Sequence, residues 1–463
     1  MSKNKGRAGF SSSLGFILAA AGSAVGLGNI WRFPYLAARD GGGFFLLVYL
    51  LLVATFGFTM LTSEIALGRR TGKGPLVAYG MAHPKFKFLG VLASVIPALI
   101  LPYYCVIGGW VIKYSVEFIT MDGAAAAADG YFTSFTSRVG EPIFCMLVFL
   151  LLTALAITLG VQQGIEKISK VAMPILLVLI IGIACYSLST SYTDASGVTR
   201  TGLEGLKIYL VPNFKNMTIV DMMDTVMDAM GQLFYSVSVA MGIMVAFGSY
   251  CPKEENLTSS INKIEIFDTI VSFFAGLMIV PTVYTFMGQE GMSAGPGLMF
   301  ITLPKVFNEM GVSGSFVGMI FFLTVFFAAI TSSISIMEAI ISGMIDRWGL
   351  ERRRCVGITL IYLMIMGILV CLGYNKFYFE LRLPNGTVGQ LLDVLDYISN
   401  LIMMPILAIG TCILIGWVVG PKYVIDEMEL DGAKFGRKWL YVPMIKFVAP
   451  ALLVILFVQS FVV

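Results

Sequence analysis

The sequence predicts an all-α membrane protein with eleven transmembrane helices, and three observations support this expectation. Of its 463 residues, 57% are hydrophobic and only 13% are charged, whereas soluble domains carry about 25% charged residues. The apolar residues form runs of about 20 residues or more, the length at which a helix crosses the hydrocarbon core. Lysine and arginine gather in alternate connections between these runs, as they do in cytoplasmic loops.

The apolar segments follow one another along the whole chain. In order they are 12–37, 43–69, 88–119, 142–160, 165–189, 226–250, 260–287, 313–345, 355–374, 390–418 and 440–463. The short basic N-terminus precedes an apolar run that is too long for a cleaved signal peptide, so we take this run as the first span. We expect one domain, 1–463, with five-helix repeats at about 10–190 and 224–420 and an extra helix at 440–463.

The basic residues set the expected orientation of the chain. With eleven spans, the basic connections all fall on the side of the N-terminus; they lie near 69–87, 167–170, 253, 347–354 and 422–438. Short cytoplasmic loops carry an excess of lysine and arginine. The N-terminus is therefore expected inside the cell and the C-terminus outside.

Two spans contain interruptions that are unusual for a membrane helix. Glycine and serine gather at 20–29 in the first span and at 231–242 in the sixth. Glycine destabilises a helix interior, and serine competes for its backbone hydrogen bonds. These spans occupy matching places in the two halves, which is the pattern of a transporter binding site. The alternative is close helix packing through small residues.

The sequence offers little support for an enzyme. His83 is the one histidine, and the seven cysteines are scattered without metal-binding spacing. A membrane enzyme would need a nucleophile with a base, or a set of metal ligands. A net charge of +3 gives no nucleic-acid footprint either.

Three motifs resemble signatures of the neurotransmitter:sodium symporter family. The segment 22–35 (GSAVGLGNIWRFPY) is similar to the first-helix signature, 295–304 to that of the fourth outer loop, and 328–333 to a helix 8 motif. They occur in the family's order, and the resemblance spans almost the whole chain. The resemblance implies inverted five-helix repeats with broken helices 1 and 6. It also implies a carrier in the bacterial cytoplasmic membrane that takes up neutral, mainly hydrophobic L-amino acids with sodium by alternating access.

The resemblance places the substrate at the two interruptions. Free amide groups at a half-helix N-terminus suit a carboxylate, and unwound carbonyls suit an ammonium group or sodium. Leu27, Gly28 and the Tyr104 hydroxyl would bind the carboxylate. The full set of implied substrate contacts is Ser23, Ala24, Leu27, Gly28, Ile100, Tyr104, Tyr235, Ser236, Ser238, Met241, Ser332 and Ile336.

Two sodium sites are implied in the same way. The first would use the substrate carboxylate, the carbonyl of Ala24 and the side chains of Asn29, Ser236 and Asp268. The second would use the carbonyls of Gly22, Val25 and Ala328 with the hydroxyls of Thr331 and Ser332. For the two hydroxyls, ordinary hydrogen bonding between helices is the alternative.

Two departures from the family pattern refine these expectations. Asp268 stands where asparagine is common. A fixed carboxylate there would repel chloride from the side chains that match the family's chloride pocket, which are Tyr49, Gln232, Ser236 and Ser272. We therefore expect no chloride requirement, unless Asp268 is a solvated helix end. Gly26 stands where carriers of monoamines have aspartate, so the substrate should bring its own carboxylate.

The expected side-chain pocket is mainly apolar. Met241 stands where phenylalanine is common, and methionine is flexible. We expect broad hydrophobic specificity that includes aromatic side chains, although a simple packing exchange is nearly as plausible.

The resemblance also implies gates on both sides. Arg32 with Asp396 would form the outer gate, and Arg7 with Asp346 the inner one. Glycine and proline at 164 and 174 in the fifth span mark where its inner half would unwind. Glu64 is expected to bond to the broken-helix backbone.

Two other functions on the same fold remain open at this point. A proton-coupled carrier would need no sodium, and an amino-acid sensor would bind without transport. The sequence gives neither the stoichiometry nor the oligomeric state.

Overall fold

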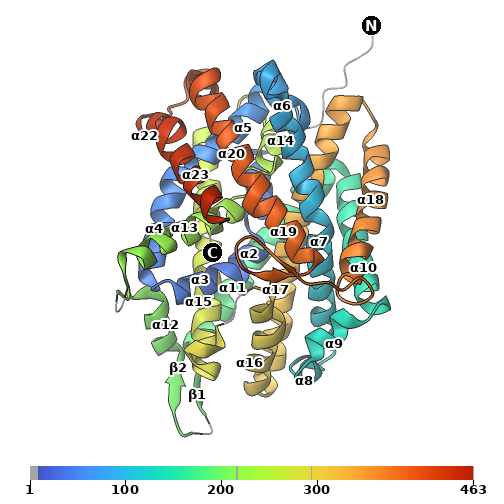
Figure 1. The fold of residues 1–463 in the computed structure, drawn as a ribbon, viewed down its shortest axis with the longest axis vertical. Coiled ribbons are helices and arrows are strands. Elements are labelled where there is room, and N and C mark those ends of the chain that lie inside the picture. The colour runs from blue at the N-terminus through green and yellow to red at the C-terminus, as the bar shows by residue number, and fades with distance from the viewer. Residues whose placement is uncertain (1–8, 195, 215–216, 293–294, 462–463) are drawn as a thin grey trace.

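The computed structural model describes residues 9–194, 196–214, 217–292 and 295–461. In this part of the chain, nine helical runs are long and apolar enough to cross a membrane. They are Gly43–Thr71, Pro84–Ile119, Gly140–Thr158, Val161–Leu188, Leu257–Met287, Val312–Trp348, Arg352–Leu372, Leu391–Val418 and Lys438–Gln459. A tenth run is the bent pair Ser13–Ala24 and Leu27–Arg39, whose halves meet at 63°. The helices stand side by side as one bundle (Figure 1).

Several of these runs join shorter helices end to end. The bent pair contains α1 (Ser13–Ala24), α2 (Leu27–Ile30) and α3 (Arg32–Arg39), and the next run contains α4 (Gly43–Leu52), the π-helix η1 (Val53–Gly57) and α5 (Phe58–Thr71). The following runs contain η2 (Pro84–Phe86) with α7 (Lys87–Ile119), α10 (Gly140–Thr158), and the π-helix η3 (Val161–Glu166) with α11 (Lys167–Leu188).

The second half of the chain is built in the same way. Its single-helix runs are α15 (Leu257–Met287), α17 (Val312–Trp348) and α18 (Arg352–Leu372). Its composite runs are α19 (Leu391–Asp396), η6 (Tyr397–Met403), α20 (Met404–Ile413) and η7 (Leu414–Val418), and then α22 (Lys438–Pro443), η9 (Met444–Val448) and α23 (Ala449–Gln459).

Short elements connect the long runs. The helical connections are α6 (Pro75–Ala82), α8 (Gly123–Ala126), α9 (Tyr131–Ser137), α12 (Gly202–Leu210), η4 (Gln289–Gly291), η5 (Leu298–Thr302), α16 (Leu303–Glu309), α21 (Lys422–Met428) and η8 (Leu430–Gly432). Two antiparallel hairpins pair β1 (Ser191–Thr193) with β2 (Thr199–Thr201), and β3 (Leu381–Arg382) with β4 (Val388–Gly389). The first hairpin projects from the lower end of the bundle in Figure 1.

The predicted sixth span is the exception among the long runs. It consists of α13 (Ile219–Ser236) and α14 (Ile243–Ser249), separated by the non-helical residues 237–242. Neither piece is a long apolar helix, because α14 is short and α13 carries three aspartates. A capping box between Thr218 and Asp221 also starts α13 at residue 219, before the expected boundary at 226. The structure thus supports ten spanning runs, and the count of eleven stays a prediction.

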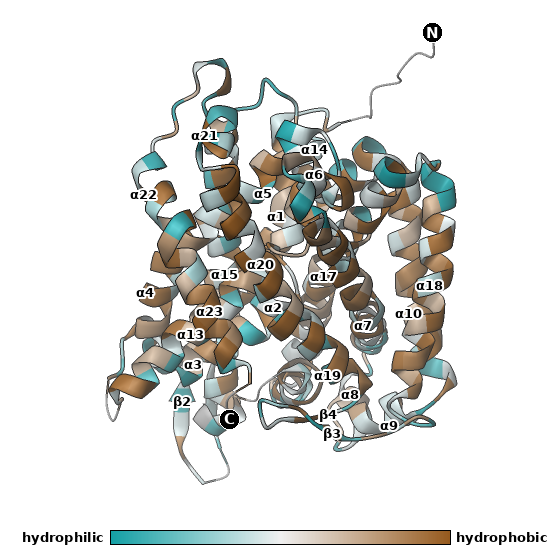
Figure 2. Cartoon of the chain, turned by 45° about the horizontal axis from the view of Figure 1, so that its top comes forward, coloured by the Kyte–Doolittle hydropathy of each residue, from teal (hydrophilic) through white to brown (hydrophobic). Residues whose placement is uncertain are grey.

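Burial follows the pattern of a protein that lies in lipid. Large apolar side chains such as Leu51, Val178 and Ile361 are exposed on the outside of the bundle. Figure 2 shows hydrophobic helices around the middle of the molecule and hydrophilic residues gathered toward its ends. Buried polar groups lie inside instead, where α1 packs against α11, α15 and α17. The interior of the bundle is therefore where a polar site can form.

Candidate functional site

The helix breaks at Gly26 in the first span. Helix α1 ends at Ala24, Val25 and Gly26 are extended, and α2 begins at Leu27. The amide of Gly26 donates to Asn29 Oδ1 at 2.9 Å, which fixes the Asn29 side chain beside the break. The expected interruption is confirmed, and it leaves backbone groups without helical partners.

The second break lies between α13 and α14. Ser238 and Ala240 have positive φ angles of 53° and 56°, a conformation that is uncommon for residues with a Cβ atom. Glu64 Oε1 accepts a hydrogen bond from the Ala240 amide at 2.6 Å, as the sequence suggested. The Ser238 hydroxyl donates to the Ser23 carbonyl at 2.8 Å and so ties this break to the first one.

A small enclosed cavity of about 20 Å³ lies between the two breaks. Its lining is Ser23, Ala24, Gly26, Asn29, Ile100, Tyr104, Tyr235, Ser238, Met241, Ser332 and Ile336. Most of the predicted substrate contacts are in this set; Leu27, Gly28 and Ser236 are not. The sequence did not include Gly26 and Asn29 among these contacts, although both lie in the interrupted stretch.

The Tyr104 hydroxyl is the unsatisfied polar group of this cavity. It is buried and has no hydrogen-bond partner among the described residues. It lies next to Gly26, where an added Cβ atom would stand 3.5 Å from the hydroxyl and 3.0 Å from Ser332 Oγ. A buried donor without a partner costs free energy, so this hydroxyl is suited to a polar ligand group.

Asp268 and four polar side chains around it form what we call the Asp268 group; the four are Tyr49, Asn29, Ser236 and Ser272. Asn29 Nδ2 lies 2.7 Å from Ser236 Oγ, 3.0 Å from Asp268 Oδ1 and 2.7 Å from Ser272 Oγ. The Ser236 hydroxyl donates to Asp268 at 2.9 Å, and that of Tyr49 does so at 3.3 Å. Asp268 has no exposed surface. The alternative of a solvated helix end is therefore wrong.

A second set of oxygens, the Ser332 group, consists of Gly22, Val25, Ala328, Thr331 and Ser332. Ser332 Oγ lies 3.4 Å from the Gly22 carbonyl and 3.1 Å from that of Val25. The Thr331 hydroxyl donates to the Ala328 carbonyl at 3.2 Å. These contacts join α1 to α17 through neutral oxygens that converge on one place.

The two residues predicted for the outer gate lie near the site without forming an ion pair. Among the described residues, Asp396 accepts from Tyr103 at 3.0 Å and from Asn400 at 2.6 Å, and no ion pair of 4 Å or less joins it to Arg32. Arg32 lies beside Gly231 instead. Sequence reasoning missed Asn400, although it lies one helical turn after Asp396 and faces the same way.

Another polar cluster, around Glu338, was also missed by the sequence reasoning. Glu338 is fully buried in α17 and receives two hydrogen bonds from Arg352, at 2.6 and 2.8 Å, and one from Tyr250 at 2.5 Å. A buried acid within an apolar span was the signal that could have revealed it. Asp346 accepts from the Gly74 amide at 2.6 Å. Arg7, its predicted partner, lies outside the described residues.

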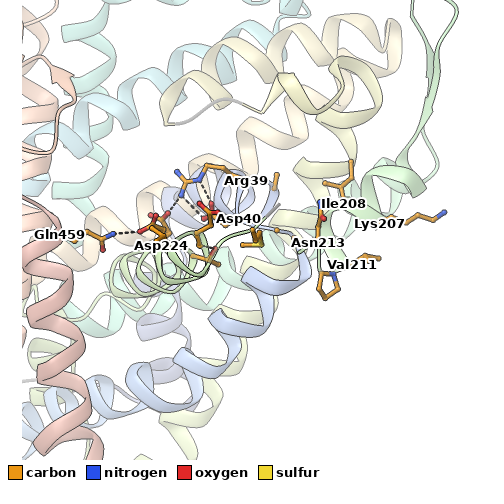
Figure 3. Close-up of a pocket in the computed structure, with 17 residues that line it drawn as sticks. Arg39, Asp40, Lys207, Ile208, Val211, Asn213, Asp224 and Gln459 are labelled. Atoms are coloured by element: carbon orange, nitrogen blue, oxygen red, sulfur yellow. Dashed lines mark hydrogen bonds and ion pairs between the residues drawn. The ribbon is translucent and has the colours of Figure 1, made fainter. Parts of the chain in front are cut away.

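A wider cavity, of about 1250 Å³, lies elsewhere, between α3, α12 and α13. Its carboxylates are already bound: Arg39 pairs with Asp40 at 2.6 Å and also with Asp228, and Gln459 donates to Asp224 at 3.2 Å (Figure 3). This cavity therefore lacks the unsatisfied groups that distinguish the site at the breaks.

An enclosed polar site between two interrupted membrane helices defines a secondary transporter. The model of the sodium:neurotransmitter symporter family matches residues 7–134 and 131–463, and the chain belongs to this family. The resemblance found from the motifs is thereby confirmed. The family consists of membrane transporters and not of enzymes.

Relatives of known sequence and structure agree with this assignment. The uncharacterised sodium-dependent transporter YhdH of Bacillus subtilis is 32% identical over 461 residues, covering 97% of either chain. The sodium- and chloride-dependent GABA transporter 2 of Rattus norvegicus is 25% identical over 472 residues, covering 91% of this chain and 74% of its own. The crystal structure of MhsT in complex with L-phenylalanine matches with a TM-score of 0.85 at 30% identity, covering 98% of this chain and 100% of MhsT.

Proposed function

We propose that the chain carries neutral, mainly hydrophobic L-amino acids, aromatic ones included, into a bacterial cell together with sodium and without chloride. It would do so by alternating access across the cytoplasmic membrane, with the N-terminus inside and the C-terminus outside. The observation that carries the proposal is the enclosed cavity at the two helix breaks. Its walls are largely apolar, and it contains the unsatisfied hydroxyl of Tyr104.

The cavity suits an amino acid at both of its ends. The amides of Leu27 and Gly28, at the N-terminus of α2 next to the lining residue Gly26, would bind a carboxylate together with the Tyr104 hydroxyl. Unwound carbonyls near Ala24 and Ser238 would face the ammonium group. Apolar side chains such as Ile100 and Ile336 would surround the side chain. MhsT, which shares the fold, was crystallised with L-phenylalanine.

The two oxygen groups suit sodium in different ways. In the Asp268 group, Asn29, Ser236, Asp268 and the Ala24 carbonyl would bind one ion, with the substrate carboxylate as a further ligand. That shared ligand would couple ion and substrate, because each would strengthen the binding of the other. In the Ser332 group, only carbonyls and hydroxyls would bind the second ion.

Asp268 supports the absence of a chloride requirement. Its carboxylate lies within hydrogen-bond distance of Tyr49 and Ser236, among the side chains where family members that need chloride would hold the anion. Two negative charges this close repel each other strongly in a dry interior. The fixed carboxylate would thus replace the anion.

Uptake into proteoliposomes tests the proposal. With an inward sodium gradient and gluconate in place of chloride, radiolabelled L-phenylalanine and L-leucine should accumulate, and potassium in place of sodium should stop the uptake. Binding without uptake would identify a sensor instead. Uptake driven equally well by a proton gradient without sodium would identify a proton-coupled carrier.

A further inference from the structure

The amino end of the first span is held by one carboxylate of the fifth span. Glu166, the last residue of η3, is only 2% exposed. Its Oε2 accepts from the Ser11 amide at 2.8 Å, and its Oε1 accepts from the hydroxyls of Ser11 and Ser12 at 2.6 and 3.0 Å. Lys170 Nζ lies 2.7 Å from the same Oε1. The Ser11 amide and the Lys170 ammonium group can only donate, and they contact different oxygens of Glu166. A carboxylate accepts at both oxygens, whereas an amide would present a donor to one of these two partners.

The same contact sets the start of α1. Ser12 is the N-cap of this helix, because its hydroxyl accepts from the Gly15 amide at 3.1 Å. A negative charge beside a helix N-terminus is stabilised by the helix dipole. Gly15 faces the carboxylate so closely that an added Cβ atom would overlap it. The glycine is therefore required for Glu166 to reach Ser11 and Ser12.

The element that carries Glu166 departs from regular α-helical geometry. η3 is a π-helix, and it follows Gly160, whose φ angle is +84°. π-Helical segments are rare and are frequent at functional sites. Gln162 of the same segment donates to the Gly9 carbonyl at 2.9 Å, so η3 holds the chain before α1 at two places.

A second contact connects this region to the Ser332 group. Met173 lies two helical turns after Glu166, on the same side of α11, and is fully buried. It packs against Gly22, which also contacts Thr331. The stretch from Glu166 to Met173 thus covers α1 from its first turn to the oxygens of the Ser332 group.

We propose that Glu166 is a positioning residue for ion release, through its hold on Ser11 and Ser12. Unwinding of the inner half of the fifth span would withdraw Glu166 and Met173 together. That one movement would free the amino end of α1 and uncover the Ser332 group to the cytoplasm. The inference rests on the proposed alternating-access function. It adds that Glu166 links the unwinding of the fifth span to the release of the amino end of α1.

Hydrogen exchange of the whole transporter in nanodiscs, with sodium and without substrate, tests the link itself. Glu166→Gln should raise amide exchange within 10–24 about tenfold, the size expected for losing a charged hydrogen-bond set. Exchange within 140–158 of α10 should stay unchanged. The sodium concentration for half-maximal substrate uptake should rise about tenfold as well.

Three further variants separate this role from general destabilisation. Ser11→Ala removes the hydroxyl that donates to Glu166 Oε1, and its effect should not add to that of Glu166→Gln. Gly15→Ala should act like Glu166→Gln, although alanine favours a helix more than glycine does. Lys170→Gln keeps the serine contacts and should leave exchange within 10–24 within about twofold of wild type.

Two results would overturn the inference: unchanged exchange within 10–24 in Glu166→Gln, or full additivity of Glu166→Gln with Ser11→Ala. Failure of the proposed function is read separately, as absence of sodium-driven uptake by the wild-type protein.

Discussion

The Asp268 group and the Ser332 group both use the interrupted stretch of the first span, yet they differ in charge and in the helices that they join. The Asp268 group contains a buried carboxylate and connects α2 with α13 and α15. The Ser332 group contains only neutral oxygens and connects α1 with α17. The difference teaches that one stretch of unwound chain can contribute to two oxygen-rich groups of different charge. We expect the first to couple sodium to the substrate, and the second to sense whether α1 and α17 are together.

Among changes in the two groups, removing the Asp268 carboxylate should have the largest effect on sodium-dependent uptake. Asp268→Asn should weaken sodium-dependent uptake about 100-fold in chloride-free medium, because a charge-assisted ligand is worth about 3 kcal/mol. Chloride should restore part of the loss in the variant and should change nothing in the wild type. Uptake titrated with sodium in gluconate and in chloride measures both.

Glu265→Gln is the control for this variant. Glu265 lies one turn before Asp268 on α15, and it pairs with Arg437 at 2.5 Å. Its loss should change the apparent sodium affinity less than about threefold. Wild-type sodium affinity in Asp268→Asn would contradict a role of the Asp268 carboxylate in sodium binding.

Removing the unsatisfied hydroxyl of Tyr104 should weaken substrate binding. Sodium binding measured without substrate should stay unchanged. Tyr104→Phe should lower amino-acid affinity about 30-fold, since a hydrogen bond to a charged group contributes about 2 kcal/mol. Equilibrium binding of labelled L-phenylalanine at saturating sodium measures this loss. Tyr114→Phe, ten residues further along α7, removes a hydroxyl that bonds to the Phe300 carbonyl and should leave binding unchanged. Equal losses in both variants would contradict the assigned role.

A change in the Ser332 group should affect sodium binding more modestly. Ser332→Ala removes one neutral ligand and should lower sodium affinity about tenfold, with no new response to chloride. Ser333→Ala is a matched control, because that hydroxyl faces Thr153 at 2.9 Å instead. Sodium titrations of substrate binding compare the two variants. If Ser333→Ala proved as damaging as Ser332→Ala, these hydroxyls would be serving helix packing and not an ion.

The smallest expected effect concerns Met241, which lines the cavity and belongs to neither group. Met241→Phe should reduce the affinity for L-tryptophan relative to L-leucine about fivefold, because a stiff ring leaves less room. Met241→Leu, with a similar volume, should change this ratio less than twofold. A competition panel at fixed sodium measures the ratio. A selectivity that stays constant across both variants would mean that Met241 only fills space.

Local signals in the sequence predicted the centre of the site well. Glycine and serine marked the breaks at Gly26 and Ser238, because these residues weaken a helix wherever they occur in it. The polar side chains next to those breaks, such as Asn29 and Ser236, were named through the family resemblance and not through a local signal. Their roles as ligands stay predictions.

Contacts between distant helices were beyond reach of the sequence. Nothing local in the chain pairs Glu338 with Arg352 and Tyr250, because their meeting depends on how α17 and α18 pack. The hold of Glu166 on Ser11 also joins segments that lie far apart along the chain. The start of α13 was missed for a different reason: a capping box extended a helix into a stretch whose aspartates lower its hydropathy.

The most direct test of the central claim compares an amino acid with its decarboxylated amine. If the substrate carboxylate completes the sodium site of the Asp268 group, sodium should raise the affinity of the purified transporter for L-phenylalanine at least tenfold. It should leave the affinity for phenethylamine unchanged. An equal effect of sodium on both ligands, or none on L-phenylalanine, would contradict the account.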